Sequence, residues 1–471
     1  MRRSLLSLIL GLAAAVSAGA AAASAAPWTL TPCKVPGGEE IVRCGKLDVP
    51  ENWSKPSGRR VSLNVVVMPK TGSGPDQPPL VWFDGGPGIP GTQGAALYST
   101  DLRFHRERRP VVLFDQRGTG QSNPLHCPKT EHRGALDDMY DAASVAACRR
   151  DLERRADLSQ YTTAASARDV DALRQALGAR QIDIAALSYG TILAQAYIAL
   201  FPHNVRAAAL IGTVPLGEKL PLHHAANGQL ALRQIFADCR AEPACRRAHP
   251  DLEGDWARLM TRLSDGPVQA ADAAGRPVTI RKGPFGEALR SMINAIPGQR
   301  RLPLIVSHAA RGDFAPFLKA AGGGEPEADG LYLSITCPEA TRRIRPEEIG
   351  PATAGAAFGR WRIDQQRIGC GAWAPATPDP RVLSPLRSRV PVLLLAGGRD
   401  ATTPVAWARE VATGLPNGRV VVIGPMAHLP DGLANMVCLD RLMDAFFAKG
   451  SAGDLDVRCV ATMTPPPFEL G

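Results

Sequence analysis

A serine at position 188 separates a strand-like run from a helix-like run, and this junction constrains the fold more than any other feature. Residues 182–187 are apolar except for Asp183, and residues 189–200 have the periodicity of a helix. The residues two positions before and after the serine are small, Ala186 and Gly190. Small neighbours let a strand and a helix approach closely at a sharp turn that exposes a serine hydroxyl. The junction therefore predicts a nucleophilic serine at the end of a buried strand.

Strand-like and helix-like runs alternate on both sides of this junction. The strand-like runs are residues 61–68, 80–83, 111–114, 182–187, 207–211, 392–396 and 420–423. Helical patterns follow at 163–177, 189–200 and about 434–447. Such alternation predicts an α/β protein with a mostly parallel central sheet flanked by helices.

A long segment interrupts the alternation. Residues 215–389 have a helical and irregular pattern, and they include four of the ten cysteines. Because this segment has apolar content, we interpret it as a large, mainly helical cap domain and not as a linker. The predicted catalytic domain then comprises residues 26–214 and 390–471.

Two further polar residues follow predicted strands. Asp400 comes after the run at 392–396, and His428 after the run at 420–423. The order serine, acid, histidine is the order of the catalytic triad in the α/β-hydrolase fold. We therefore predict that Ser188 is the nucleophile, that His428 is its base, and that Asp400 orients His428. The other histidines lack this placement, and His223-His224 is interpreted as a solvated pair near the cap.

An acyl transfer by serine requires two backbone N–H donors for the developing oxyanion. One is expected from Tyr189, directly after the nucleophile. The other is expected from Gly85 or Gly86, in a glycine-rich loop that follows the strand at 80–83. No Gly-Lys-Ser/Thr motif is present, so this loop is not interpreted as a phosphate site.

The N-terminus has the pattern of a secretory signal peptide. Arg2 and Arg3 precede a short apolar run, and Ala23-Ser24-Ala25 fits a cleavage site. A membrane anchor is the alternative, but the run is rich in alanine and only weakly apolar. We expect residues 1–25 to be removed, which places the mature chain in the periplasm or outside a bacterial cell without stable membrane association.

The ten cysteines form an even set, which in a secreted chain predicts disulfides. Spacing alone does not prove how they pair. Pairing each cysteine with its nearest neighbour gives Cys33–Cys44, Cys127–Cys148, Cys239–Cys245, Cys337–Cys370 and Cys438–Cys459. A zinc site is the alternative, but no C-x-x-C or H-x-x-x-H spacing supports one. We expect neither a metal nor an organic cofactor.

The chain of 471 residues has a formal net charge of +9, which is mildly basic. No run of lysine and arginine is long enough to indicate a nucleic-acid surface. A solvated basic surface is the better interpretation, and these features leave the oligomeric state open.

Taken together, the motifs resemble the prolyl aminopeptidase and tripeptidyl aminopeptidase family of α/β-hydrolases, over about residues 40–460. The matching motifs are D-G-G-P-G at 84–88, D-Q-R-G-T-G-Q-S at 115–122, S-Y-G-T at 188–191, G-R-D at 398–400, and His428. The cysteine pattern is most similar to the secreted branch. Two positions depart from the family: Asp84 stands where histidine is frequent, and Ala186 replaces the first glycine of the serine turn.

The resemblance implies release of residues from the free N-terminus of a peptide, a reaction that needs an anion to bind the substrate ammonium. Glu339 lies where related members carry an acidic cap residue, so the resemblance implies this role for it. An esterase or lactonase with the same triad is the first alternative. A secreted binding protein that kept the fold without activity is the second. The expected partner is a peptide or another small acyl substrate.

Overall fold

The computed structural model describes residues 28–272, 274–321 and 327–471. The predicted signal peptide at 1–25 lies outside these residues. None of the helices described within these ranges is long and apolar enough to cross a membrane.

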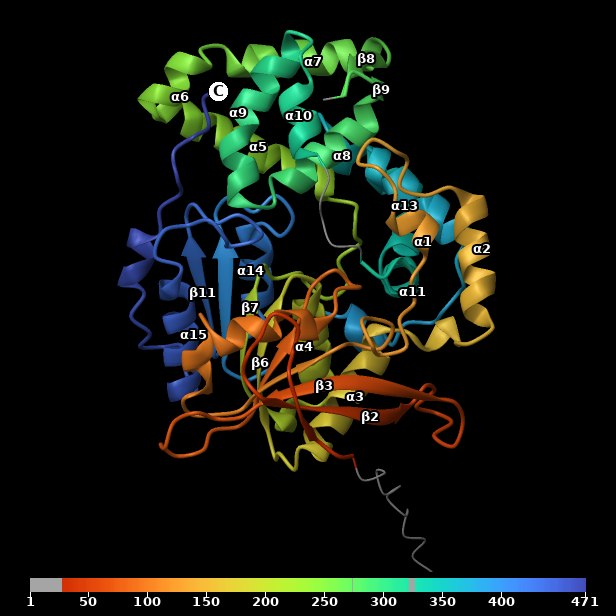
Figure 1. The fold of residues 1–471 in the computed structure, drawn as a ribbon, viewed down its shortest axis with the longest axis vertical. Coiled ribbons are helices and arrows are strands. Elements are labelled where there is room, and N and C mark those ends of the chain that lie inside the picture. Colours follow the sequence, from red (N-terminus) through yellow and green to blue (C-terminus); the bar gives the residue numbers. More distant parts are fainter. Residues whose placement is uncertain (1–27, 273, 322–326) are drawn as a thin grey trace, which may run out of the picture.

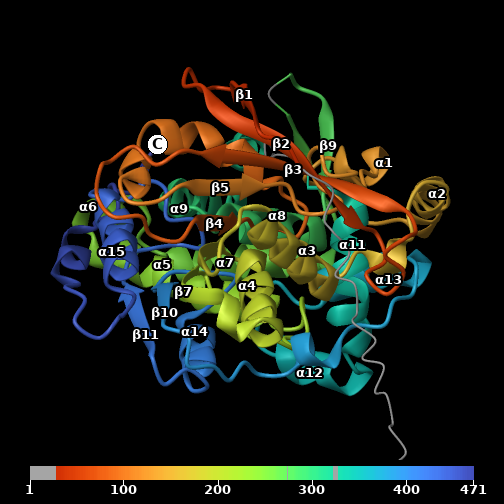
Figure 2. The same cartoon turned by 90° about the horizontal axis from the view of Figure 1, so that it is seen from below.

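A nine-stranded sheet forms the centre of the molecule, in the order β1-β2-β3-β5-β4-β6-β7-β10-β11. Its strands are β1 (Thr31–Cys33), β2 (Val42–Pro50), β3 (Arg60–Met68), β4 (Leu80–Phe83), β5 (Val111–Phe114), β6 (Ile182–Leu187), β7 (Val205–Ile211), β10 (Val392–Gly397) and β11 (Gly418–Ile423). The pairs from β5 through β11 are parallel. The pairs β1–β2, β2–β3 and β3–β5 extend the sheet and are antiparallel. The antiparallel strands lie at one edge and β11 at the other (Figure 2). The mostly parallel α/β sheet predicted from the sequence is thus confirmed, with β1 and β2 as strands that the pattern did not reveal.

Two apolar layers cover the sheet. One contains α3 (Thr163–Ala176), α4 (Tyr189–Leu200) and α14 (Val405–Ala412), and the other contains α15 (Val437–Lys449). Because both faces are covered, the central strands are apolar on both sides, as β5 and β10 are throughout.

Strand β10 pairs in parallel with β7, although the chain between them forms a large separate layer. This layer stands above the sheet and has its own apolar core (Figure 1). It comprises α5 (His224–Ala241), α6 (Pro243–Ala248), α7 (Leu252–Asp265), β8 (Val268–Ala271), β9 (Pro277–Ile280), α8 (Lys282–Met292), α9 (Ile296–Ala310) and α10 (Ala315–Ala320).

The rest of the inserted chain packs differently. It comprises α11 (Asp329–Glu339), α12 (Pro346–Thr353) and α13 (Trp361–Ala372). Apolar residues of α11 and α13 share the core of the sheet layer with α2 (Ala142–Glu153), which follows the short helix α1 (Pro128–Glu131). The insertion is therefore joined to the sheet layer through α11 and α13 and is not a detached lid.

Each cysteine is bonded to its nearest neighbour along the chain. The five disulfides are Cys33–Cys44, Cys127–Cys148, Cys239–Cys245, Cys337–Cys370 and Cys438–Cys459. Constrained loops of this kind typically stabilise a fold by about 2–4 kcal/mol each.

Candidate active site

Ser188 lies at the sharp turn between β6 and α4, with a backbone φ of 55°. A positive φ is uncommon for a residue with a side chain, and it marks a strained turn held by its surroundings. The Ser188 N–H donates to the carbonyl of Ile211, 3.0 Å away in β7. A Cβ atom at Gly190 would collide with the carbonyl of Phe83 in β4, so only glycine fits there. The geometry is that of the nucleophile turn expected from the sequence.

Asp400 and His428 come from loops at the carboxyl ends of β10 and β11. The Nδ1 atom of His428 lies 2.9 Å from Oδ2 of Asp400. Asp400 Oδ1 accepts from the backbone N–H groups of Thr402 and Thr403, each 2.7 Å away. With its carboxylate held in this way, Asp400 fixes the orientation of the imidazole and leaves Nε2 for other chemistry.

One cavity of about 460 Å³ is lined by both Ser188 and His428. Its size is ordinary for a site that binds a small molecule. The glycine-rich loop after β4 also lines it, with Gly85 and Gly86. The structure thus brings the predicted nucleophile, base and oxyanion loop to a single cavity.

Hydrogen bonding in the loop after β4 separates the two candidate oxyanion donors, Gly85 and Gly86. The Gly85 N–H donates to Oδ1 of Asp84 at 2.7 Å, while Trp82 Nε1 donates to Oδ2 of the same carboxylate at 3.1 Å. Gly85 is therefore already engaged, which leaves Gly86 as the candidate from this loop. Burial raises the pKa of Asp84, and the hydrogen bonds from Gly85 and Trp82 oppose that rise.

A buried chain of hydrogen bonds supports the serine turn from behind. The Tyr189 hydroxyl lies 3.1 Å from Gln116 Nε2 and 3.0 Å from Thr163 Oγ1. Gln116 belongs to the 115–122 motif, and Thr163 begins α3. This motif therefore braces the serine turn through Gln116.

Glu339 completes this chain and does not line the cavity. Its two carboxylate oxygens accept from Thr163 N at 2.8 Å and from Thr163 Oγ1 at 2.6 Å. Burial raises the pKa of Glu339 to about 7. The role of Glu339 in binding a substrate ammonium stays a prediction that this geometry does not support, because both of its oxygens accept from Thr163 behind the cavity wall.

The acid that does face the cavity beside the oxyanion loop is Glu327. A Cβ atom at Gly88 would meet the Glu327 Cβ at 3.2 Å, and the Ala328 N–H donates to the Gly88 carbonyl at 3.1 Å. Burial, with a further contribution from Asp329, raises the pKa of Glu327 to about 7. Its carboxylate makes no hydrogen bond to a residue within the described ranges. Sequence reasoning missed it, because no periodicity or motif marks it.

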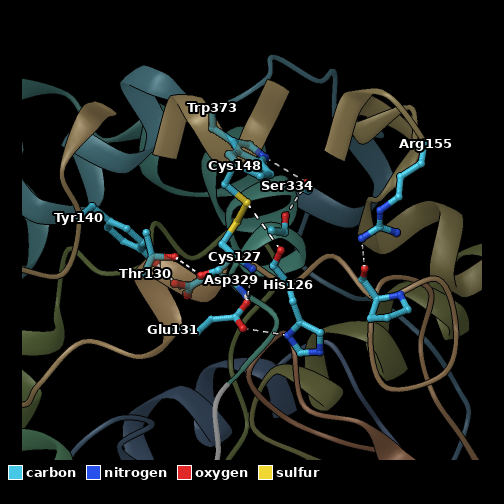
Figure 3. Close-up of a disulfide and its surroundings, with 12 residues drawn as sticks. His126, Cys127, Thr130, Glu131, Tyr140, Cys148, Arg155, Asp329, Ser334 and Trp373 are labelled. Atoms are coloured by element: carbon cyan, nitrogen blue, oxygen red, sulfur yellow. Dashed lines mark hydrogen bonds and ion pairs between the residues drawn. A yellow bond between two sulfur atoms is a disulfide. The ribbon is translucent and has the colours of Figure 1, made fainter. Parts of the chain in front are cut away.

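The disulfide Cys127–Cys148 anchors another part of the cavity wall (Figure 3). Glu131, four residues after Cys127, accepts from the N–H groups of Cys127 at 2.6 Å and Asp329 at 2.9 Å. Glu131 and Asp329 both line the cavity. The disulfide therefore fixes a loop of the sheet layer against the start of α11.

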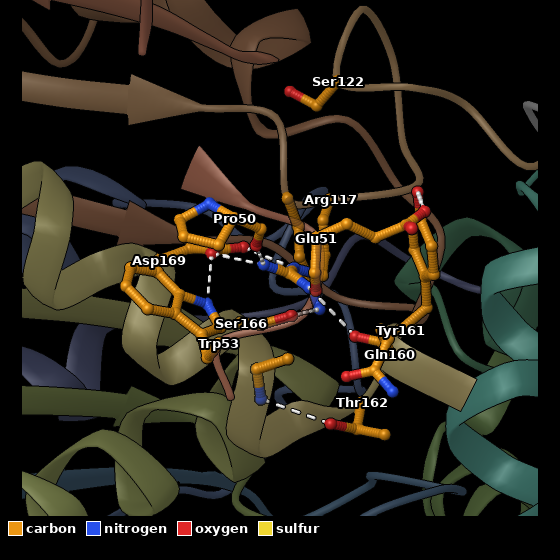
Figure 4. Close-up of polar contacts among 12 residues, drawn as sticks. Pro50, Glu51, Trp53, Arg117, Ser122, Gln160, Tyr161, Thr162, Ser166 and Asp169 are labelled. Atoms are coloured by element: carbon orange, nitrogen blue, oxygen red, sulfur yellow. Dashed lines mark hydrogen bonds and ion pairs between the residues drawn. The ribbon is translucent and has the colours of Figure 1, made fainter. Parts of the chain in front are cut away.

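A second buried network lies beneath the 115–122 motif (Figure 4). Arg117 donates two hydrogen bonds to Asp169, each 2.6 Å long, and both side chains are fully buried. Trp53 Nε1 also donates to Asp169, at 3.1 Å. This network joins the motif to α3 and to the loop after β2, so it belongs to the scaffold and not to the cavity.

The two adjacent histidines occupy different environments, contrary to the expectation of a solvated pair. His223 is partly exposed and lies 2.7 Å from Glu218. His224 begins α5, is only 7% exposed, and lines the cavity. The helix turns consecutive residues to different faces, so one histidine points outward and the other inward.

The fold and the site define an α/β-hydrolase of the serine type. A family profile described as alpha/beta hydrolase fold matches residues 78–278, and one described as TAP-like protein matches residues 355–459. The serine protease Hip1 of Mycobacterium tuberculosis is 31% identical, with 92% of this chain and 91% of that protein covered. The tripeptidyl aminopeptidase of Streptomyces coelicolor is 24% identical over 90% of this chain and 84% of that protein.

The chain therefore belongs to the family of TAP-like α/β-hydrolase serine peptidases. Its predicted identity as a serine hydrolase of the peptidase type is confirmed at this level. A solved structure of a thermophilic esterase from Thermogutta terrifontis aligns with a TM-score of 0.41 and 15% identity, covering 86% of this chain and 99% of that one.

Proposed function

We propose that the protein is a secreted serine exopeptidase that acts at the free N-terminus of peptides through Ser188, His428 and Asp400. The observation that carries the proposal is the placement of Ser188 and the Asp400-bound His428 on one cavity. The relatives named a tripeptidyl aminopeptidase and a serine protease support a peptide as the substrate. The five disulfides fit an extracellular protein.

In this proposal His428 Nε2 takes the proton of Ser188 Oγ as the oxygen attacks the substrate carbonyl carbon. The negative charge moves to the carbonyl oxygen, where the N–H groups of Tyr189 and Gly86 stabilise it. The C–N bond then breaks, and His428 gives its proton to the leaving amine. A water molecule, activated by His428, releases the acyl group from Ser188 by the reverse sequence.

Recognition of the free N-terminus falls to the acidic groups beside the oxyanion loop. Glu327 faces the cavity without a hydrogen-bond partner among the described residues, and Asp84 and Asp329 line the same cavity. An ammonium group placed there gains charge-assisted hydrogen bonds that an acylated N-terminus lacks. Glu327 thus takes the role that the sequence assigned to Glu339. The proposed cap, residues 215–389, supplies this acid.

A panel of substrates tests the proposal. The purified protein is given proline, alanine and tripeptide anilides with free N-termini, together with short acyl esters. Turnover of at least one anilide is expected, with labelling by a fluorophosphonate that Ser188→Ala abolishes. Turnover of esters alone would identify an esterase, and the lack of both turnover and labelling would identify a binding protein.

A further inference from the structure

The cavity next to Ser188 carries a second charged group, distinct from the acids beside the oxyanion loop. Glu287 accepts from Arg290 Nη2 at 2.7 Å and from Arg362 Nη1 at 2.8 Å. Arg290 Nε donates to the second oxygen of Glu287 at 3.1 Å. The remaining contacts of the two arginines are with neutral oxygens, Thr402 Oγ1 and the Tyr332 hydroxyl. Two guanidinium groups thus share one carboxylate, and the group keeps one uncompensated positive charge.

The ionised state of Glu287 supports a net charge of +1 for the group of Glu287, Arg290 and Arg362. Burial would raise its pKa, but the charges of Arg290 and Arg362 outweigh that effect and lower it to about 2. Glu287 is therefore ionised at any pH near neutrality. It compensates one arginine, and neither arginine pairs directly with a second carboxylate among the described residues.

His224 lies against this group and lacks hydrogen-bond partners. It lines the cavity and is 7% exposed, and neither ring nitrogen has a partner among the described residues. The Nε atom of Arg362 is likewise buried without a partner there. Burial, with the charges of Arg290 and Arg362, holds the pKa of His224 well below its usual range. Buried polar groups are nearly always paired. Arg362 Nε and one nitrogen of the neutral His224 ring are therefore donors that lack an acceptor among the described residues.

The position of this group relative to the reaction follows from its contacts. Arg290 Nη1 donates to Thr402 Oγ1 at 3.2 Å, and Thr402 N donates to Asp400 at 2.7 Å. Leu429, the residue after His428, donates its N–H to the Asn294 carbonyl at 2.8 Å. The group is thus tied to the loops that carry Asp400 and His428. Because His428 protonates the leaving amine in the proposed mechanism, the leaving half of the substrate lies on this side.

We propose that His224, Arg290 and Arg362 form a carboxylate-binding subsite for the leaving half of the substrate. This inference rests on the proposed function and narrows its substrates to peptides that carry an N-terminal ammonium and a carboxylate close to the cut bond. The ammonium meets Glu327, and a carboxylate close to the cut bond meets the arginines. That carboxylate belongs either to the free C-terminus of the leaving residue or to its acidic side chain.

Matched peptides test the subsite. All share the acyl part that the anilide panel identifies, and they differ in the leaving group: alanine, alanine amide or aspartate amide. The free acid should exceed alanine amide in kcat/KM by about tenfold or more, because a hydrogen bond to a charged group is lost with the amide. Equal gains for alanine and aspartate amide would show that either carboxylate is accepted, while a gain for alanine alone identifies the C-terminus.

Two variants locate the effect. His224→Gln removes no hydrogen bond that the described residues make, and it keeps a polar side chain at this position. His224→Gln and Arg362→Gln should each bring the ratio of kcat/KM for the free acid to kcat/KM for the amide close to one. Arg360→Gln is the matched control: Arg360 is exposed, pairs with Asp364, and should keep the wild-type ratio.

The outcomes separate this inference from the proposed function. If the wild-type ratio is near one, or if it survives both variants, the subsite is refuted even though anilides are hydrolysed. If anilides are not hydrolysed, the proposed function fails, and calorimetry of Ser188→Ala with trialanine and trialanine amide decides on the subsite. The subsite is supported if Ser188→Ala binds the free-acid peptide more tightly than the amide and if Ser188→Ala/His224→Gln does not. Equal binding of the two peptides by Ser188→Ala would overturn the subsite.

Discussion

Glu339 Oε2 lies 2.6 Å from Thr163 Oγ1, and this contact joins the inserted segment to the helix behind the serine turn. Thr163 in turn lies 3.0 Å from the Tyr189 hydroxyl. The carboxyl group is thus two hydrogen-bonding steps from the residue whose N–H is proposed as an oxyanion donor. Its ionisation affects the fold more directly than the reaction.

Replacing Glu339 by glutamine should change how stability depends on pH. The folded-state pKa is about 7, above the ordinary value of 4.5, so the folded protein holds this proton more tightly. The resulting stabilisation is complete below about pH 4.5 and is lost as pH rises to about 7, by on the order of 3 kcal/mol. The difference in unfolding temperature, wild type minus Glu339→Gln, should therefore fall between pH 4.5 and 7 and stay level above.

Glu347→Gln is the control for this measurement, since Glu347 is exposed. Its difference from wild type should not vary over the same pH range. A Glu339→Gln difference that grows with pH would contradict the assignment.

Replacing Asp400 by asparagine should remove nearly all activity while the fold remains. Without the carboxylate, the imidazole loses both its orientation and the stabilisation of its charged form. Loss of this acid in a serine triad lowers kcat by roughly 10⁴. The turnover of the best anilide measures the effect, with the exposed Asp431→Asn as control. A loss of less than tenfold would mean that another group orients His428.

Replacing Glu327 by glutamine should weaken the preference for a free N-terminus. The loss of a charge-assisted contact predicts a decrease of about ten- to a hundredfold in kcat/KM for free-amine anilides. N-acetylated anilides should change little. Because the pKa of Glu327 is about 7, the wild-type ratio of free to acetylated substrate should rise from pH 5.5 to 7.5. A ratio in Glu327→Gln that rises with pH as in wild type would exclude this carboxylate.

Replacing Asp169 by asparagine should destabilise the protein strongly. Arg117 would remain buried without its counter-ion, and breaking a buried pair on one side costs about 3–5 kcal/mol. Denaturant unfolding of the oxidised protein measures this change. Asp456→Asn breaks an exposed pair with Arg458 and should leave the unfolding midpoint where it is. Equal shifts of the unfolding midpoint in the two variants would show that the buried Arg117–Asp169 pair contributes no more to stability than an exposed pair.

The parts of the site that follow strands were predictable from the sequence. Ser188, Asp400 and His428 each come after a mainly apolar run, and parallel strands bring such positions to one edge of the sheet. The inference needed only apolar patterning and chain order. For the same reason β6 was predicted with its observed bounds.

Residues that reach the cavity from irregular or inserted segments were not predictable. Glu327 and Glu339 are both acids near α11, and only the packing of α11 determines which faces the cavity. The sequence placed His224 in solvent together with its neighbour His223. Which of the two is buried depends on which face of α5 is covered, and the sequence pattern does not reveal that. Residues 42–50 also lack clear alternation, so β2 became evident only through its pairing with β3.

The pairing of β10 with β7 across the insertion also bears on the order in which the site is made. During translation, Ser188 is synthesised well before Asp400 and His428, which follow the whole inserted segment in the sequence. Contacts between residues so distant in sequence form late in folding, after the cost of closing the loop between them has been met. A partly synthesised chain therefore carries the proposed nucleophile without its base, and hydrolysis is withheld until synthesis has passed residue 428.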